Sequence, residues 1–300
     1  MKITMDKQDF AGMRVVIMGL GLHRGGLESA RYLAKRGALL TVTDLRDEKV
    51  LAPSIEKLEA ALGTTNAALS TINAVGDFKI RYVLGRHEEA DFKNADMVIK
   101  NPGVRPDSPY ILLARRIETD ISLFLAANPA RLLAVTGSKG KSFTASALHW
   151  ALRKAREKGL LAGGAYLGGN ITVSPLSFLD ELGPADDVVL ELSSWQLGDL
   201  RGKSDLRGRP LLKARAAVLT AIMSDHQDRY GSMESYVDDK RLIYRGQDAS
   251  SATVAWDDDW GRSFLAETPG RPLLCAESPP AENVAGGWVS DPRAAGFARP

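Results

Sequence analysis

The first part of the chain alternates apolar runs with amphipathic segments. An apolar run from Arg14 to Met18 leads into Gly19-Leu20-Gly21, and behind it apolar residues recur at helical spacing until Gly37. A second apolar run, from Leu39 to Val42, ends at Asp44. Strand, glycine turn, helix and strand in this order predict a βαβ unit with a parallel sheet.

Further elements of the same sheet follow. Segment 47–76 has the pattern of a helix followed by a loop, while 80–84 and 97–99 are apolar enough to be strands. Pro102 and Gly103 begin a loop rich in prolines. We therefore expect a Rossmann-like parallel-sheet domain over residues 1–118.

A second succession of strands and helices begins after Asp120. Apolar residues from Ala145 to Ala155 share one helical face directly behind a glycine-rich turn. The other expected elements are strands over 132–135, 188–190 and 216–223 and a helix over 235–244. Beyond Gly270 the Pro-, Gly- and Ala-rich sequence predicts no element. This pattern predicts an α/β domain over residues 119–300.

Composition narrows the class of protein. A length of 300 residues suits two domains, and 44% apolar with 25% charged residues is ordinary for a soluble protein with a core. The 39 basic and 37 acidic residues nearly cancel, so neither nucleic acid nor an anionic membrane is expected as a partner. The single cysteine, Cys275, excludes an internal disulfide and favours a reducing compartment.

The N-terminus and the hydropathy pattern point to the cytoplasm. Residues 1–10 mix lysines with aspartates and lack the apolar centre of a secretory signal. No apolar run approaches the ~20 residues that span a bilayer. We expect a cytoplasmic monomer whose partners are small molecules.

The strongest chemical signal is the run Thr136-Gly137-Ser138-Lys139-Gly140-Lys141-Ser142. A glycine-rich turn between a strand and a helix lets backbone N–H groups surround phosphates at a helix N-terminus. Lys141 would reach the β- and γ-phosphates, and the Ser142 hydroxyl would bind Mg²⁺. Val135 stands where the strict phosphate-loop pattern has its first glycine, so an ordinary turn is the alternative.

Two polar residues follow later buried strands. Glu191 ends an apolar strand, where a carboxylate beside a phosphate loop can bind Mg²⁺ or simply meet solvent. His226 lies in Asp225-His226-Gln227-Asp228, as a candidate metal or substrate ligand or an ordinary loop histidine.

The N-terminal turn partly matches a dinucleotide-binding fingerprint. Gly19, Gly21 and Gly25 precede a helix, and Asp44 ends the next strand. Arg24 occupies the third-glycine position, however, which would move the helix N-terminus away from a pyrophosphate. Nucleotide binding of some kind and tight strand–helix packing remain alternatives, and NAD binding is weakly supported.

Taken in order, six stretches resemble the Mur ligase family from about Arg14 to Asp259. They are Gly19-Leu20-Gly21-Leu22, Asn101-Pro102-Gly103, Thr136 to Ser142, Gly168-Gly169-Asn170-Ile171, Glu191-Leu192-Ser193-Ser194-Trp195-Gln196-Leu197 and Asp225-His226-Gln227-Asp228-Arg229-Tyr230. The resemblance implies an α/β fold in which a P-loop-type ATPase domain follows the Rossmann-like domain. It also implies an ATP-dependent amide ligase of peptidoglycan precursor synthesis, with an acyl-phosphate intermediate. The members that add D-glutamate to UDP-N-acetylmuramoyl-L-alanine are the most similar.

The resemblance also implies roles for single positions. The implied UDP-sugar contacts are Leu22, His23, Asp44, Arg46, Gly103 and Asn170. The implied ATP contacts are Thr136, Gly137, Ser138, Lys139, Gly140, Lys141 and Ser142. The implied ligands of two Mg²⁺ ions are Ser142, Glu191, His226 and Lys240, the last as a carbamate. The implied catalytic residues are Lys141, His226, Lys240 and Asn170.

Several positions depart from the family pattern. Lys139 replaces a usual Asn or Thr, Ala221 replaces an Asn, and Ser122 replaces a Glu. The family continues with a third domain, so this chain is expected to be an incomplete enzyme whose turnover is open. The alternatives are a Mur ligase for another amino acid, a folylpolyglutamate synthase, an NAD-dependent dehydrogenase and a non-catalytic nucleotide-binding protein.

Overall fold

A computed structural model of the chain describes residues 10–22, 25–63, 73–75, 78–171, 173–277, 285–291 and 294–298. Their contacts divide into two compact units. The first unit comprises the described residues of 10–128 together with 173–180, and the second comprises 129–171 and the described residues of 181–298.

The first unit is built on a six-stranded sheet with the order β3-β4-β2-β1-β5-β6. Its strands are β1 (Arg14–Met18), β2 (Leu39–Asp44), β3 (Asn73–Val75), β4 (Phe78–Leu84), β5 (Met97–Lys100) and β6 (Ile117–Glu118). All pairs are parallel except β3 with β4. Every residue of β5 is buried, as expected for a parallel strand covered on both faces.

The helices of this unit are α1 (Gly25–Ala34), α2 (Glu48–Ala61), α3 (Glu89–Asn94), α4 (Pro109–Leu112) and α5 (Asp120–Ala127). Later in the chain, the short helix η1 (Pro175–Ser177) also belongs to it, and η2 (Leu179–Glu181) spans the boundary between the two units. Asp47 caps α2 by accepting a hydrogen bond from the Val50 N–H, which satisfies a backbone donor at the helix start. On one side of the sheet Phe92 and Ile111 pack against Val16 and Val98.

Helix α5 packs within the first unit. Ser122, which departs from the family's Glu, completes a reciprocal cap with Thr119 at the start of this helix. Phe124 meets Phe178 edge-on, with ring centroids 6.1 Å apart. The compact units therefore divide after Asn128, later than the domain boundary expected at residue 118, and the segment 173–180 returns to the first unit.

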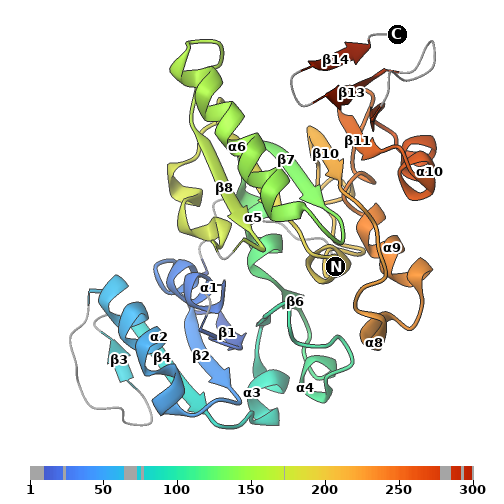
Figure 1. The fold of residues 1–300 in the computed structure, drawn as a ribbon. Coiled ribbons are helices and arrows are strands. Elements are labelled where there is room, and N and C mark those ends of the chain that lie inside the picture. Colours follow the sequence, from blue (N-terminus) through green and yellow to red (C-terminus); the bar gives the residue numbers. More distant parts are fainter. Residues whose placement is uncertain are drawn as a thin grey trace. The chain divides into compact units, whose positions relative to one another are not determined.

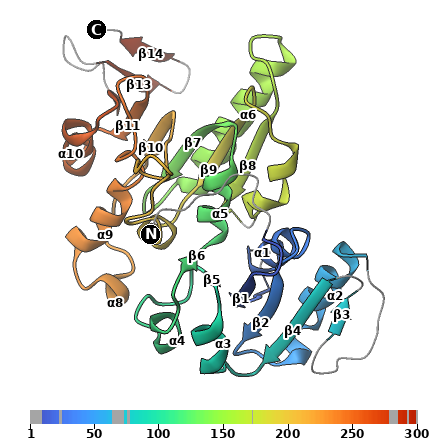
Figure 2. The ribbon, with the colours of Figure 1, turned by 180° about the vertical axis from the view of Figure 1, so that it is seen from behind.

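The second unit is built on an eight-stranded sheet with the order β14-β13-β12-β11-β10-β7-β9-β8. Its strands are β7 (Arg131–Thr136), β8 (Ala165–Gly169), β9 (Asp187–Glu191), β10 (Ala216–Leu219), β11 (Ala252–Trp256), β12 (Arg271–Ala276), β13 (Gly286–Asp291) and β14 (Ala294–Ala298). All pairs are parallel except β13 with β14. Figure 2 shows β9 between β7 and β8.

Five helices among the described residues belong to the second unit. They are α6 (Lys141–Glu157), α7 (Ser194–Gly198), α8 (Gln227–Tyr230), α9 (Met233–Arg241) and α10 (Asp259–Glu267). Helix α6 covers β7, β8 and β9 (Figure 1), and Ala145 packs there against Val135 and Val189. None of the helices in the described ranges has the length and apolar character needed to cross a membrane.

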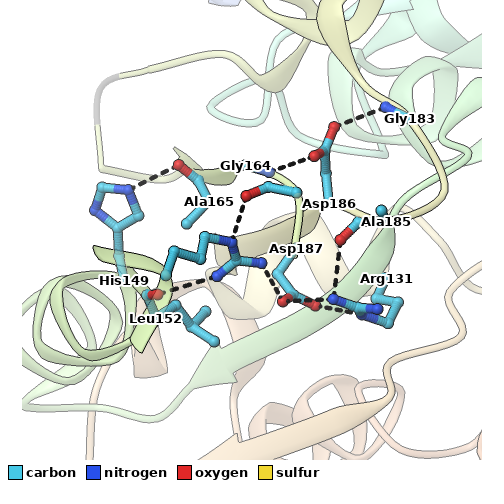
Figure 3. Close-up of polar contacts among 11 residues, drawn as sticks. Arg131, His149, Leu152, Gly164, Ala165, Gly183, Ala185, Asp186 and Asp187 are labelled. Atoms are coloured by element: carbon cyan, nitrogen blue, oxygen red, sulfur yellow. Dashed lines mark hydrogen bonds and ion pairs between the residues drawn. The ribbon is translucent and has the colours of Figure 1, made fainter. Parts of the chain in front are cut away.

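A polar cluster ties together the amino ends of β7 and β9 (Figure 3). The buried Asp187 carboxylate accepts hydrogen bonds from Arg131 at 2.7 and 3.0 Å and from Arg156 of α6 at 2.5 Å. Burial opposes ionisation, but the hydrogen bonds from the two arginines lower the pKa of Asp187. On α6, His149 also bonds the Ala165 carbonyl oxygen through Nε2. The cluster lies at the opposite end of β9 from Glu191, so it stabilises the fold and leaves the carboxyl ends of the strands to the candidate site.

Most predicted strands are confirmed, with one correction. The strand expected over 216–223 ends at Leu219, because the chain then turns so that the Ala221 carbonyl oxygen accepts from the Ser138 N–H at 2.9 Å. Strands β12, β13 and β14 lie in the region where the sequence predicted no element. The expected loop before residue 76 lies largely outside the described residues.

Candidate active site

The turn between β7 and α6 has the geometry of a phosphate-binding loop. Gly137 and Gly140 have φ angles of 148° and 84°, which residues with a Cβ rarely adopt. A Cβ on Gly137 would also overlap the Thr220 hydroxyl. The first N–H groups of α6 have no acceptor within the helix, and Lys141 is its first residue. The loop therefore offers backbone donors and a cation to an anion.

Two lysines converge on one carbonyl oxygen of this loop. Lys141 Nζ donates to the Gly137 oxygen at 2.9 Å and to the Ser138 oxygen at 3.1 Å. Lys240 Nζ, from α9, donates to the same Gly137 oxygen at 2.9 Å although 103 residues separate the two in sequence. The structure thus brings together the loop and a lysine that only the family resemblance had singled out.

The environment perturbs both ammonium groups. Burial lowers the pKa of Lys141, while Glu191 and Asp225 oppose that effect. Lys240 is 1% exposed, and burial, followed by repulsion from Lys141, lowers its pKa to about 7. A substantial fraction of Lys240 is therefore present as the neutral amine near neutral pH.

Glu191 occupies the carboxyl end of β9 and is 1% exposed. Its Oε1 accepts from the Asn170 side chain at 2.9 Å, and its backbone oxygen accepts from the Asn170 N–H at 2.8 Å. Its Oε2 is buried and has no hydrogen-bond partner among the described residues. An anionic oxygen left without a donor is costly unless a cation satisfies it, so Glu191 fits the role of a metal ligand.

His226 has an unusual backbone conformation. Its φ of 51° makes it the only residue other than glycine with a positive φ in the described part of the chain, and it directly precedes α8. Its ring packs against Trp195 at 4.8 Å between centroids, and Nε2 lies 3.6 Å from the Asp225 carboxylate. The ring remains partly exposed.

The structure brings some of the predicted metal ligands close to the loop. Lys240 and the loop are in contact, and Glu191 lies close enough for its charge to act on Lys141. Ser142 is exposed at the start of α6. No group of three or more His, Cys, Asp or Glu side chains in the described ranges could hold a metal by themselves. A metal here would depend on phosphate, hydroxyl or carbamate oxygens as well.

Other predicted ATP-loop residues have internal partners. Thr136 donates through its hydroxyl to the Leu192 oxygen at 2.7 Å. The Ser138 hydroxyl bonds the Met223 backbone and the Tyr236 hydroxyl, each at 2.9 Å. Lys139, by contrast, is exposed. The side chains of Thr136 and Ser138 thus hold the shape of the loop, a role that local sequence patterns did not reveal.

The glycine turn of the first unit is organised around a carboxylate. Asp44 accepts from the Gly21 N–H at 3.1 Å and from the Arg46 N–H at 3.0 Å. Leu22 is 51% exposed beside it, whereas His23 lies outside the described residues. Gly103, in another loop of the unit, donates to the Asn101 side chain at 3.1 Å. The described UDP-sugar candidates of this unit therefore lie at the end of a strand, as Asp44 does, or in the loops that follow strands.

The close strand–helix contact of this turn belongs to Gly26. A Cβ on Gly26 would overlap the carbonyl oxygens of Gly19 and Leu20, whereas one on Gly25 would meet only Asp120 at 3.6 Å. The dinucleotide-binding pattern expects this glycine at position 24, where Arg24 stands, and Gly25 follows one residue late. The glycine that packs is Gly26, which the pattern did not single out although the neighbouring Gly25-Gly26 pair was an available signal.

Two α/β units with a glycine turn each, one of them rich in lysine between a strand and a helix, are typical of nucleotide-binding proteins. Residues 13–122 match the "Mur ligase MurD-like, N-terminal domain", and residues 135–277 match the "Mur ligase middle domain". The chain belongs to the Mur ligase family.

Curated relatives agree with this family. The chain is 47% identical over 266 residues to UDP-N-acetylmuramoylalanine–D-glutamate ligase of Treponema pallidum (strain Nichols), covering 85% of this chain and 46% of that protein. It is 40% identical to the ligase of the same name of Borreliella afzelii (strain PKo), covering 92% of this chain and 54% of that protein. The chain thus spans about half the length of the curated relatives it matches.

A solved structure supports the fold. The UDP-N-acetylmuramate:L-alanyl-gamma-D-glutamyl-meso-diaminopimelate ligase from Neisseria meningitides aligns with a TM-score of 0.54 at 18% identity. The alignment covers 92% of this chain and 81% of that chain. The expected α/β architecture is confirmed, and the nicotinamide alternative finds no support in these matches.

Proposed function

We propose that this chain carries the nucleotide-sugar and ATP units of a ligase that adds D-glutamate to UDP-N-acetylmuramoyl-L-alanine in peptidoglycan precursor synthesis. The observation that carries the proposal is the convergence of Lys141 and Lys240 on the Gly137 oxygen, near the buried Glu191. The names of the relatives at 47% and 40% identity support the choice of amino acid. A Mur ligase for another amino acid is the alternative.

In this proposal the loop binds the ATP phosphates. Backbone N–H groups at the start of α6 and the Lys141 ammonium attract the phosphate oxygens and stabilise negative charge during phosphoryl transfer. Lys141 already lies against the loop, so it needs only to exchange carbonyl oxygens for phosphate oxygens. The substrate carboxylate would accept the γ-phosphoryl group as ADP leaves. The amine of the amino acid would then attack the acyl carbon, and the amide forms as phosphate leaves and the amine loses a proton.

The residues of the second unit fit the Mg²⁺ ions that the family implies. Ser142, Glu191, His226 and Lys240 as a carbamate would hold them, and bound Mg²⁺ would neutralise phosphate charge. Asn170 orients the Glu191 carboxylate so that Oε2 stays free of protein donors. Forming the carbamate joins the nitrogen of the neutral Lys240 amine to carbon dioxide and releases one proton. Starting from the ammonium form, two protons are released, and an anion replaces a cation beside Lys141.

The first unit is proposed to bind the UDP part of the sugar nucleotide. Asp44 has both oxygens fixed by backbone donors and is suited to accept from hydroxyl or base N–H groups. Leu22, Arg46 and Gly103 supply apolar, cationic and backbone contacts, and His23 and Asn170 retain their predicted roles. We also propose a cytoplasmic monomer, as the single Cys275 and the small-molecule substrates suggest.

Calorimetric titration of UDP-N-acetylmuramoyl-L-alanine, with UDP and NADH as comparators, tests the substrate class. Binding of the muramoyl nucleotide well above UDP, with no binding of NADH, is expected. A separate titration with ATP and Mg²⁺ should give binding that Lys141→Met removes. Preference for NADH, or no binding of the muramoyl nucleotide, would contradict the assignment of the first unit.

A further inference from the structure

The Asp239 side chain joins three helices of the second unit. From α9, its Oδ2 accepts from the Tyr230 hydroxyl of α8 at 2.9 Å, and its Oδ1 accepts from Arg201, beyond α7, at 2.7 Å. Gly198, the last residue of α7, lies so close that an added Cβ would overlap the carboxylate. We call Asp239 with Tyr230, Arg201 and Gly198 the Asp239 junction.

Each helix at this junction is connected to a candidate ligand of the ATP site. Helix α7 begins three residues after Glu191, helix α8 begins directly after His226, and α9 carries Lys240 next to Asp239 itself. Glu191 ends β9, His226 directly precedes α8 and Lys240 lies within α9, so no continuous element fixes their spacing. The Asp239 carboxylate links the helices next to them, alongside the packing of Trp195 against His226 and Arg229.

Helix α8 relies on contacts with neighbouring elements. It has only four residues and no buried one, and left-handed residues, His226 and Gly231, flank it on both sides. A helix of one turn is not stable on its own. The Tyr230 ring packs against Tyr236 of α9 at 5.3 Å, and the Tyr230 hydroxyl bonds Asp239. These contacts determine where α8, and therefore His226, lies.

We propose that Asp239 is a positioning residue that holds α7, α8 and α9 in register, so that Glu191, His226 and Lys240 keep their places around the ATP loop. The inference rests on the proposed function and adds a residue that contacts neither phosphate nor metal. A carboxylate is required because it accepts from a hydroxyl and a guanidinium at once. Gly198 is required because only a residue without a side chain leaves room for that carboxylate.

The neighbouring Asp238 provides a matched control. It lies on the same helix and forms ion pairs with Arg201 at 2.8 Å and Arg245 at 2.6 Å. Its described partners include no residue of α7 or α8. Asp238→Ala therefore removes an acid of the same size from α9 without breaking the link to Tyr230.

The first measurement is hydrogen exchange without ligand. Asp239→Ala should raise amide exchange in α8 by about tenfold, the factor expected from losing a charge-assisted hydrogen bond, while Asp238→Ala leaves α8 unchanged. Gly198→Ala should give the same change by a steric route, and Asp239→Asn, which can still accept from Tyr230, a smaller one. Equal exchange in the two alanine variants would overturn the junction.

The second measurement separates positioning from general stability. ADP affinity is titrated by calorimetry with Mg²⁺ and with a chelator. Asp239→Ala should weaken Mg²⁺-dependent binding about tenfold and leave binding in the chelator within about twofold, because the loop itself is unchanged. Equal weakening in both buffers would mean that Asp239 only stabilises the fold. Absence of ADP binding by the wild-type chain would overturn the proposed function and this inference together, whereas binding that Asp239→Ala leaves intact would overturn this inference alone.

Discussion

The two units each carry a glycine turn between a strand and a helix, but opposite charges organise the two turns. In the first unit the carboxylate of Asp44 accepts from the Gly21 N–H. In the second, the ammonium groups of Lys141 and Lys240 donate to the Gly137 oxygen. A phosphate needs N–H donors and cations, whereas a hydroxyl or base N–H needs an acceptor. A glycine turn therefore supplies space, while side chains that reach it from neighbouring elements select the ligand atoms.

The largest expected effect comes from a substitution that disrupts the glycine turn of the first unit. Gly26→Ala should destabilise the first unit by about 3 kcal/mol, because the added methyl group overlaps two backbone carbonyl oxygens. All five tryptophans lie at or beyond residue 150, so tryptophan fluorescence follows the second unit. Denaturant unfolding should show circular dichroism lost early and fluorescence little changed. Gly25→Ala, whose Cβ has room, is the control, and equal behaviour of the two variants would refute the packing role of Gly26.

The next effect concerns charge at the second turn. Lys141→Met should weaken ATP binding by about 100-fold, because a cation that contacts phosphate is replaced by an apolar side chain of similar length. UDP binding by the first unit should be unchanged. Calorimetry with both nucleotides measures the two effects in one preparation. Loss of UDP binding as well would mean that the two turns do not act independently.

A smaller expected effect is a change in the stability of the first unit with pH. Burial lowers the pKa of His87, whose Nδ1 lies 2.7 Å from the Thr43 hydroxyl. Below about pH 6.5 the unfolded chain therefore binds a proton more readily than the folded one, so stability falls as the pH drops from that value towards the lowered pKa. Because the ring is partly exposed, the loss should be below about 1 kcal/mol. Denaturation monitored by circular dichroism between pH 7.5 and 5 should show this slope, and His87→Gln should remove it. A slope that persists in His87→Gln would assign it to another group.

The smallest effect concerns the additional cation of the second turn. Lys139 is exposed, so Lys139→Asn should weaken ATP binding only about threefold at low salt. The difference between Lys139→Asn and wild type should vanish as ionic strength rises, because exposed charges are screened. Calorimetry at two salt concentrations measures it. A loss as large as that of Lys141→Met would show that Lys139 contacts the phosphates directly.

Local pattern predicted the strands that position both turns. The runs ending at Met18 and Val135 are apolar, and a glycine follows the first directly and the second after Thr136, so strand and turn are encoded in neighbouring residues. The strand predicted over 216–223 was too long, because Ile222 and Met223 extend the apolar run past Leu219. The chain turns there instead, and the Ala221 carbonyl oxygen accepts a hydrogen bond from the phosphate-loop residue Ser138. Strand β12 was missed because Pro272 stands near its start.

Long-range contacts explain what local pattern left out. Nothing near Lys240 indicates that its amine meets Gly137, and only the family resemblance singled it out. The left-handed conformation of His226 likewise follows from how α8 is held, and the hydrogen-bond partners of Asp239 come from α8 and from the turn after α7. Such contacts depend on the assembled fold, so the sequence could identify the residue types but not their geometry.

The two ends of the five-residue strand β9 have different roles. Its first residue, Asp187, is fixed by two arginines, and its last, Glu191, keeps one carboxylate oxygen free of protein donors. Substitutions near Glu191 therefore alter the candidate site without breaking the ion pairs of Asp187. A mutational library confined to the carboxyl ends of β7, β9 and β10 should yield folded proteins at higher frequency than one confined to Arg131, Arg156 and Asp187. In evolutionary terms, because ion pairs fix the amino end of β9, the sequences of the loops at its carboxyl end can change without loss of the fold.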